Sequence, residues 1–180
     1  MKELSLNILD LAQNSITAGA SLVKIEVIED PSLKTLTVRI SDNGCGMSAG
    51  LLASVTDPFT TTRTTRKAGL GIPLFKMAME QTGGFFQIES EPGVGTAVTG
   101  VMRMSHLDSV PLGDMAGTMM ALIQGSPGLD FLYRRAIDST EFLLDTAELR
   151  DTLGDVSLGE PDVLSWVVGF INENENELKG

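Results

Sequence analysis

The chain contains 180 residues, of which 42% are hydrophobic and 21% charged, with a formal net charge of −11 and a single cysteine. This length can build one substantial core and leaves room for a small second one. No apolar run reaches the roughly 18 residues that a membrane span needs, and the first residues lack the basic-then-apolar pattern of a secretory signal. We therefore expect a soluble cytoplasmic protein without an internal disulfide.

The negative charge is concentrated in the C-terminal part. Residues 1–104 hold nine Lys and Arg against ten Asp and Glu, whereas residues 105–180 hold four against fourteen. Such an acidic segment repels phosphate backbones, so we expect no nucleic-acid partner, and no membrane association is indicated. A basic or amphipathic protein surface suits this charge as a partner. The alternative is that the charges only solvate a small domain.

The first hundred residues alternate between helical and strand patterns. Helical spacing over 4–18 is followed by two runs of alternating apolar residues, which predict an antiparallel hairpin that ends at Asp42. The expected elements of this part are helices over 4–18, 49–55 and 69–81, strands over 22–28, 35–41, 85–90 and 96–104, and a loop over 56–68.

We place a domain boundary near residue 105, where a segment rich in Gly and Pro begins. Residues 106–128 are expected to be largely a connection or irregular segment. Beyond the boundary the sequence predicts a small acidic α+β domain of unknown role. Its expected elements are strands over 119–124 and 131–137 and helices over 146–153 and 161–173, followed by a frayed polar tail.

Three motifs in the N-terminal part indicate a nucleotide pocket. Asp42-Asn43-Gly44-Cys45-Gly46-Met47 places a carboxylate beside two glycines that let the backbone approach a ligand. Phe59-Thr60-Thr61-Thr62-Arg63 begins a loop rich in Thr and Arg. Gly69-Leu70-Gly71 can open a helix over a phosphate group.

Asp10 and Asn14 add oxygen donors on the first helix. They are four residues apart, so their side chains lie on one face within reach of one ligand. Mg²⁺ prefers oxygen ligands and often bridges one or two protein groups to nucleotide phosphates. Asn14 can contact such an ion directly while Asp10 orients a water. The alternative is an ordinary solvated helix face.

Taken in order, and together with Gly93-x-Gly95-Thr96, these motifs resemble the GHKL ATPase superfamily of gyrase, chaperone, histidine-kinase and mismatch-repair ATPases. The resemblance covers roughly residues 4–104 and is closest to the ATP-binding domains of histidine kinases. It implies the Bergerat fold, an α/β two-layer sandwich with a mixed, largely antiparallel sheet that helices cover on one face.

The resemblance also implies a role for each matching residue. Asn14 would bind Mg²⁺, and Ala18 would form part of the adenine wall. Asp42 would accept the adenine amino group, sharing the site with Thr96. A buried carboxylate that accepts from this amine discriminates adenine from guanine, which presents an oxygen there. Asp10 stands where many ATP-hydrolysing members have Glu as the base that activates water.

The remaining nucleotide-binding residues follow from the same resemblance. The lid that begins at Phe59 would supply cations for the β- and γ-phosphates, and the Gly-x-Gly at the next helix would offer backbone N–H groups. The implied residues are Gly44, Gly46 and Met47 beside the base, Phe59, Thr60, Thr61, Thr62, Arg63, Arg66 and Lys67 in the lid, and Gly69, Leu70 and Gly71 at the phosphates.

We therefore expect a Mg-ATP-binding protein that either hydrolyses ATP or phosphorylates a separate protein. The nucleotide-binding helix begins almost at Met1, so the chain is expected to lack its own phosphoacceptor domain. In the alternative function, ATP orders the lid and gates association with a partner without phosphoryl transfer. A DNA-dependent ATPase is disfavoured by the charge.

Three single residues have simpler expectations. The only histidine, His106, is expected to be a surface or boundary residue rather than a phosphoacceptor. Cys45 is expected to be a small packing residue. Trp166 is expected to anchor the C-terminal part, whereas an exposed Trp at this position would mark an interface.

Overall fold

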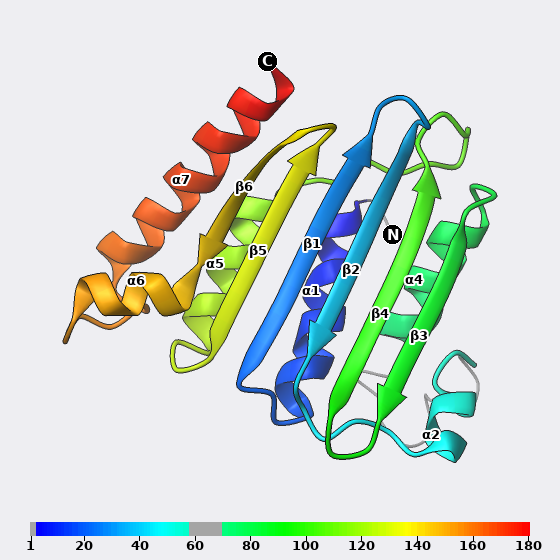
Figure 1. The fold of residues 1–180 in the computed structure, drawn as a ribbon, viewed down its shortest axis with the longest axis horizontal. Helices are drawn as coiled ribbons and strands as arrows, with labels where there is room; N and C mark the ends of the chain where they lie inside the picture. The colour runs from blue at the N-terminus through cyan, green and yellow to red at the C-terminus, as the bar shows by residue number, and fades with distance from the viewer. Residues whose placement is uncertain (1–2, 58–69) are drawn as a thin grey trace.

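The computed structural model describes residues 3–57 and 70–180, which form a six-stranded mixed sheet with helices packed on it (Figure 1). The strand order across the sheet is β3-β4-β2-β1-β5-β6. The strands are β1 (Leu22–Asp30), β2 (Thr35–Asp42), β3 (Phe85–Glu91), β4 (Gly95–Arg103), β5 (Asp130–Ile137) and β6 (Thr140–Asp145). The helices are α1 (Leu4–Thr17), α2 (Ala49–Ser54), α4 (Gly71–Glu80), α5 (Met115–Gly125), α6 (Thr146–Leu153) and α7 (Pro161–Lys179).

The predicted two-layer arrangement is confirmed. Helices α1, α4 and α5 lie behind the sheet in Figure 1 and bury its apolar face. The opposite face of the sheet carries partly exposed charged side chains, among them Glu26, which is 3.1 Å from Arg134 and 3.9 Å from Arg39. Every strand pair is antiparallel except β1 with β5, as the expected mixed, largely antiparallel sheet requires.

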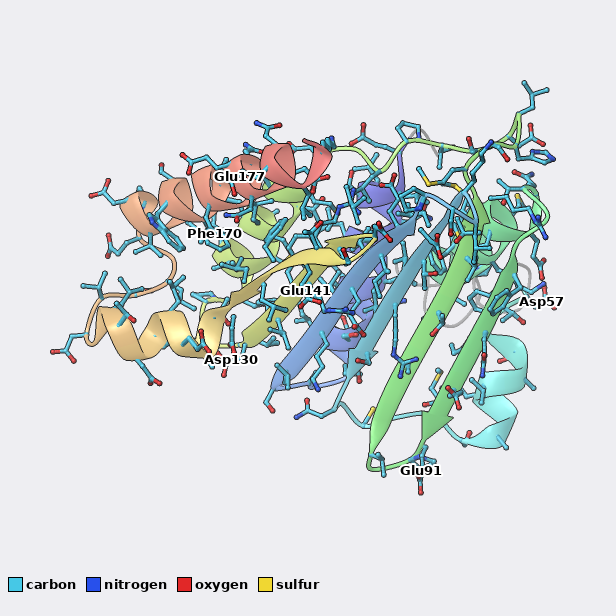
Figure 2. All side chains as sticks on the ribbon, turned by 45° about the horizontal axis from the view of Figure 1, so that its top comes forward. Asp57, Glu91, Asp130, Glu141, Phe170 and Glu177 are labelled. Carbon is cyan, nitrogen blue, oxygen red and sulfur yellow. The ribbon has the colours of Figure 1, made fainter. Side chains whose placement is uncertain are left out.

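The register of the central strands places Asp42 at one end of the sheet. The predicted β1–β2 hairpin is confirmed, with Val23 opposite Asp42. On its other side β2 pairs with β4, which puts Asp42 opposite Thr96. Figure 2 marks this end of the sheet by Glu91, at the β3–β4 turn, and by Asp130, where β5 starts. Residues far apart in sequence therefore meet at the lower end of the sheet as drawn in Figure 1.

The C-terminal segment continues the same sheet. Strand β5 pairs in parallel with β1, and β6 then pairs with β5. Helix α5 packs between α1 and α7, so the buried apolar residues of both parts form one cluster. The proposed boundary near residue 105 lies in the connection between β4 and α5. The division of the chain into two domains stays a prediction.

The prediction of a strand over 119–124 is wrong, because this segment belongs to α5. The same helix occupies part of the segment 106–128, which was expected to be irregular. The Asp114 carboxylate caps the helix by accepting a hydrogen bond from the Gly117 N–H at 2.9 Å. Its buried apolar residues follow helical spacing over more than two turns: Met115, Ala116, Met119, Leu122 and Ile123. Frequent glycines and a short apolar run concealed this period in the sequence.

Two further differences concern the end of the chain. Strand β6 was not predicted, although Phe142 and Leu144 alternate toward the core. The last helix continues to Lys179, so the expectation of a frayed tail after residue 173 is wrong. None of the helices in residues 3–57 and 70–180 combines the length and apolar character that crossing a membrane requires.

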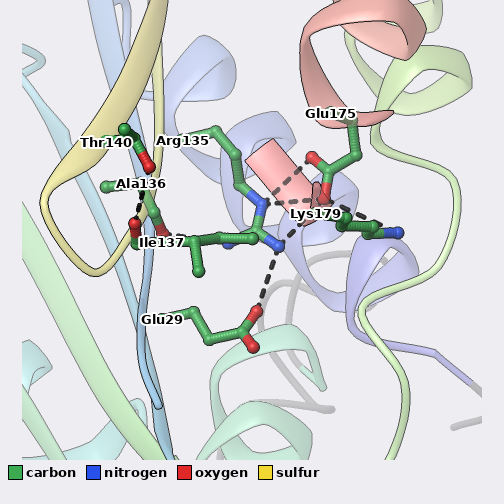
Figure 3. Close-up of polar contacts among 7 residues, drawn as sticks. All are labelled: Glu29, Arg135, Ala136, Ile137, Thr140, Glu175 and Lys179. Carbon is green, nitrogen blue, oxygen red and sulfur yellow. Dashed lines mark hydrogen bonds and ion pairs between the residues drawn. The ribbon is translucent and has the colours of Figure 1, made fainter. Parts of the chain in front are cut away.

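A buried ion-pair network fastens the last helix to the sheet (Figure 3). The guanidinium of Arg135, on the core face of β5, donates to both carboxylate oxygens of Glu175 on α7 at 2.9–3.1 Å. It also donates to Glu29 on β1 at 3.2 Å and to the carbonyl of Ala136 at 3.1 Å. The Arg135 side chain is only 3% exposed. Its charge is therefore neutralised by carboxylates from two separate elements.

Replacement of this arginine is expected to destabilise the fold strongly. Arg135→Ala removes the buried guanidinium from Glu29 and Glu175, leaving Glu175 only the exposed Lys179 at 3.8 Å, and breaking such a buried pair costs about 3–5 kcal/mol. The neighbouring Arg134→Ala is the matched control, because Arg134 lies on the open face and its partly exposed pairs contribute below about 1 kcal/mol. Urea unfolding followed by circular dichroism measures both. Equal losses in the two variants would contradict a structural role for the buried network.

Candidate nucleotide-binding site

A cavity of about 310 Å³ opens at the end of the sheet where β2 ends and β4 begins. Its volume falls at the lower end of the range of about 300–1,000 Å³ that is common for small-molecule sites. Helix α1, the loop after β2 and helix α2 enclose it. The apolar lining includes Leu11, Ala18, Ile40, Met47, Leu51, Val55, Ile72 and Val98, and the polar lining includes Asn14, Ser15, Thr17, Asp42 and Thr96. Such a lining suits a flat apolar ring with a few polar groups.

The Asp42 carboxylate is held rigidly at this cavity. The Ser15 hydroxyl donates to Oδ2 of Asp42 at 2.6 Å, and the Gly44 N–H donates to Oδ1 at 2.8 Å. Each carboxylate oxygen can accept more than one hydrogen bond, so the group keeps capacity for a ligand donor. The two protein donors fix the direction in which that capacity points.

The glycine loop after β2 is packed between α1 and the β3–β4 turn. The Cys45 N–H donates to the Ala18 carbonyl at 2.9 Å, and the Cys45 carbonyl accepts from the Gly93 N–H at 2.7 Å. Gly46 has φ +70°, and a Cβ at this position would lie 2.0 Å from the Glu91 carbonyl oxygen. Only glycine fits this close approach. Backbone contacts thus fix the loop together with the Asn43 side chain, whose Oδ1 accepts from the N–H groups of Ser21 and Leu22 at 2.9 and 3.0 Å.

A polar relay connects this loop to β4. The Ser90 hydroxyl accepts from the Met47 N–H at 2.8 Å and lies 2.8 Å from the Thr96 hydroxyl. Sequence reasoning missed both Ser90 and Ser15. The signal was present, since each serine occupies a core-facing position in an otherwise apolar period: Leu4, Ile8, Leu11 and Ser15 on α1, and Phe86, Ile88 and Ser90 on β3.

The start of α4 lies beside the oxygen donors of α1. A Cβ on Gly71 would be 3.5 Å from the Asp10 Cβ and 3.6 Å from the Asn14 amide nitrogen. The first turn of a helix leaves N–H groups without partners inside the helix, and Pro73 has no N–H to offer. Gly71 and Ile72 thus begin a helix whose dipole and free N–H groups favour an anion at its start. This start lies next to Asp10 and Asn14.

Asp10 is partly withdrawn from water at this place. Desolvation raises the pKa of its carboxyl group above the ordinary value of 3.8. A carboxylate that is less well solvated is also a better proton acceptor. Because the side chain remains exposed, this shift has little bearing on stability.

The predicted site residues differ in how the structure places them. Six of them line the cavity: Asn14, Ala18, Asp42, Gly46, Met47 and Thr96. Gly44 packs closely against Ala18, since a Cβ on Gly44 would lie 2.9 Å from the Ala18 Cβ. Asp10 and Gly71 lie together at the start of α4, whereas Leu70 precedes that helix with a side chain that is 41% exposed. The predicted lid residues Phe59, Thr60, Thr61, Thr62, Arg63, Arg66 and Lys67, and Gly69 after them, lie outside the described residues.

Two of the single-residue expectations can be compared with these surroundings. Cys45 was expected to pack, but its side chain is exposed, and its backbone makes the contacts that hold the loop. His106 lies exposed just after β4, which agrees with the expected surface position.

The family model for histidine kinase-, DNA gyrase B-, and HSP90-like ATPases matches residues 1–106. The chain belongs to this family. The resemblance that the motifs indicated is thereby confirmed, and the cavity described above lies within the matched residues. The chain therefore contains a histidine-kinase-like ATP-binding domain.

Similar curated proteins are much longer than the matched segment. The chain is 32% identical over 110 residues to the non-motile and phage-resistance protein of Caulobacter vibrioides, covering 56% of this chain and 13% of that protein. It is 35% identical over 97 residues to the sensor protein kinase FleS of Pseudomonas aeruginosa, covering 54% of this chain and 24% of that protein. The chain thus spans less than a quarter of the length of either relative.

A solved structure shares the fold over more of the chain. The ATPase domain of Aquifex aeolicus MutL, complexed with ADP, superposes with a TM-score of 0.52 and 15% sequence identity. The superposition covers 85% of this chain and 68% of that domain. This coverage exceeds the family match, so the shared fold takes in part of the segment after residue 106.

The close approach at Gly46 leads to a stability prediction. Gly46→Ala is expected to destabilise the protein by at least about 2 kcal/mol, because the new Cβ meets a carbonyl oxygen in a backbone conformation that L residues rarely adopt. Gly50→Ala is the matched control. Gly50 lies in α2 with open space around it, so alanine there is expected to be neutral or stabilising by up to about 1 kcal/mol. Denaturant unfolding compares them, and a neutral Gly46→Ala would contradict the packing of the loop.

Proposed function

We propose that the chain binds Mg-ATP and either hydrolyses it or transfers its γ-phosphoryl group to a separate protein. One observation carries the proposal: the same cavity is lined by a fixed carboxylate at Asp42 and by Asn14. Asn14 in turn adjoins Asp10 and the start of α4. This arrangement supports a nucleotide whose adenine meets Asp42 and whose phosphates meet the start of α4.

In this proposal the adenine amino group donates to Asp42. Ser15 and Gly44 orient the carboxylate, while the apolar lining packs on both faces of the ring. Guanine presents a carbonyl oxygen at the corresponding position and would face the carboxylate without a proton between them. Selectivity for adenine follows.

The phosphates then lie over the first turn of α4. The amide oxygen of Asn14 fits a magnesium ion, which keeps several waters and takes its other ligands from phosphate oxygens, while Asp10 orients one of the waters. Among the described residues no group of three or more His, Cys, Asp and Glu side chains is arranged to hold a metal. The ion would therefore arrive with the nucleotide, as its usual chemistry requires.

Asp10 is proposed as the base that orients water or an acceptor hydroxyl. Its raised pKa and its place beside Gly71 support this role. A second candidate function, ATP-gated binding of a partner without phosphoryl transfer, is favoured by the shorter reach of Asp compared with the Glu of many ATP-hydrolysing relatives.

Titration calorimetry with ATP, ADP and GTP in Mg²⁺ tests nucleotide binding. We expect ATP and ADP to bind and GTP to bind far more weakly. Asp42→Asn keeps the shape of the side chain but replaces one carboxylate oxygen by an NH2 donor. It should weaken ATP binding by about tenfold to a hundredfold, the range for a hydrogen bond to a charged group. Asp151→Asn, on the exposed face of α6, is the control. Unchanged affinity in Asp42→Asn would overturn the adenine assignment.

Turnover separates the two candidate functions. With ATP hydrolysis measured across pH, a base at Asp10 predicts a rate that falls as pH drops through a pKa above 3.8, because the protonated carboxyl cannot accept a proton. Asp10→Asn should abolish turnover while ATP affinity changes little. Tight ATP binding without turnover, with or without added acceptor protein, would instead support the gating function.

A further inference from the structure

Near the edge of the sheet formed by β6, a line of aromatic rings runs from the core to the surface. The ring of the buried Tyr133 meets Phe142 of β6 edge-on at 5.9 Å, and Phe142 meets Phe170 of α7 edge-on at 6.0 Å. Phe170 then stacks on Trp166 with ring centroids 5.0 Å apart. The last ring, Trp166, is 50% exposed. The largest side chain of the protein is therefore held on the surface by contacts that lead back to the core.

This placement differs from that of a packing residue. Helix α7 already buries Val163, Leu164, Val167 and Ile171 on its inner side, so Trp166 is not needed to attach the helix. A large aromatic that is half exposed and fixed by stacking loses little conformational entropy when a partner covers it. Tryptophan is among the residues most enriched at energetically dominant interface positions.

Acidic side chains surround Trp166 on the outer side of α7. At about 100° per residue, Asp162, Glu173 and Glu177 lie within about 40° of Trp166 around the helix axis. All three are exposed, and within residues 3–57 and 70–180 none of them forms a salt bridge. Glu175 projects from the opposite side of the helix, where Arg135 neutralises it. The uncompensated charge of α7 is thus gathered on its aromatic face.

We propose that this face of α7 docks a helical segment of a partner protein, basic on one face and carrying at least one large aliphatic side chain. The docking face consists of Asp162, Trp166, Phe170, Glu173 and Glu177, and Figure 2 labels Phe170 and Glu177 on this helix. The aliphatic side chain packs on the Trp166–Phe170 pair, while Lys or Arg side chains reach the carboxylates on either side. This inference concerns a surface away from the nucleotide cavity and does not depend on ATP binding.

The same charges argue against two other occupants. A second copy of the chain, joined through the same face, would bring like carboxylates together. A nucleic acid would bring phosphates to the same carboxylates. A basic segment is instead attracted, because residues 105–180 hold four Lys and Arg against fourteen Asp and Glu and so steer a cation toward this part.

The sequence supplies a reporter at the docking face, since Trp166 is the only tryptophan. The full chain is titrated with three synthetic helical peptides: one with a Leu stripe and a Lys face, one with Glu in place of Lys, and one with Ala in place of Leu. We expect the Leu/Lys peptide to shift Trp166 emission to shorter wavelength in a saturable manner. The Glu peptide should produce no shift, and the Ala peptide should bind at least tenfold more weakly.

Matched variants distinguish docking from general attraction between charges. Glu173→Lys combined with Glu177→Lys should weaken binding of the Leu/Lys peptide at least tenfold. Glu89→Lys combined with Asp108→Lys makes the same change in net charge on exposed residues away from α7 and should leave binding within about twofold. Trp166→Ala, followed by anisotropy of a labelled peptide, should also lose at least tenfold in affinity.

Three outcomes would overturn the proposal. Equal affinity of Trp166→Ala and the unaltered chain would reduce the interaction to charge alone. Equal losses in the two double-Lys variants would remove the special role of α7. A blue shift that grows with protein concentration in the absence of peptide, together with a dimer in sedimentation, would assign the face to a second copy of the chain.

Discussion

The candidate site depends on the double pairing of β2. Because β2 pairs with β1 on one side and β4 on the other, Asp42 faces Thr96 at the point where the chain turns into the glycine loop. Side chains in a strand alternate between faces, so a register shift of one residue would send Asp42 to the open face of the sheet. The loop contacts of Gly44 and Gly46, and the serine relay to Thr96, all presuppose this register.

Sequence patterns were most informative where structure is local. The apolar period of α1 and the alternation of the β1–β2 hairpin predicted the elements that carry Asn14 and Asp42, because these signals lie within a few residues. Ser15 and Ser90 interrupt apolar patterns at core-facing positions, but these patterns do not identify their partners, because α1 and β3 meet the loop only in the folded chain. Helix α5 was mistaken for a strand because a short apolar run is ambiguous and its Asp114 cap was overlooked.

The acidity of the C-terminal part has two different physical settings. Glu175 points toward the sheet, where it pairs with Arg135. The same arginine also pairs with Glu29 on β1. The carboxylates on the outer side of α7 are exposed and form no salt bridge with any other residue that the structure describes. A net charge read from composition treats these groups alike, although one holds the helix in place and the others shape the field that a partner meets.

The parallel pairing of β1 with β5 bears on how the chain acquires its structure. Leu22 aligns with Asp130, so this contact closes a very long loop, whereas the β1–β2 hairpin is local. Contacts between distant residues form slowly because of the entropy of loop closure. During synthesis β1 is therefore an open edge strand until residues 130–137 have emerged, and such an edge can pair wrongly with another chain. The late arrival of β5 converts this vulnerable edge into the middle of the sheet.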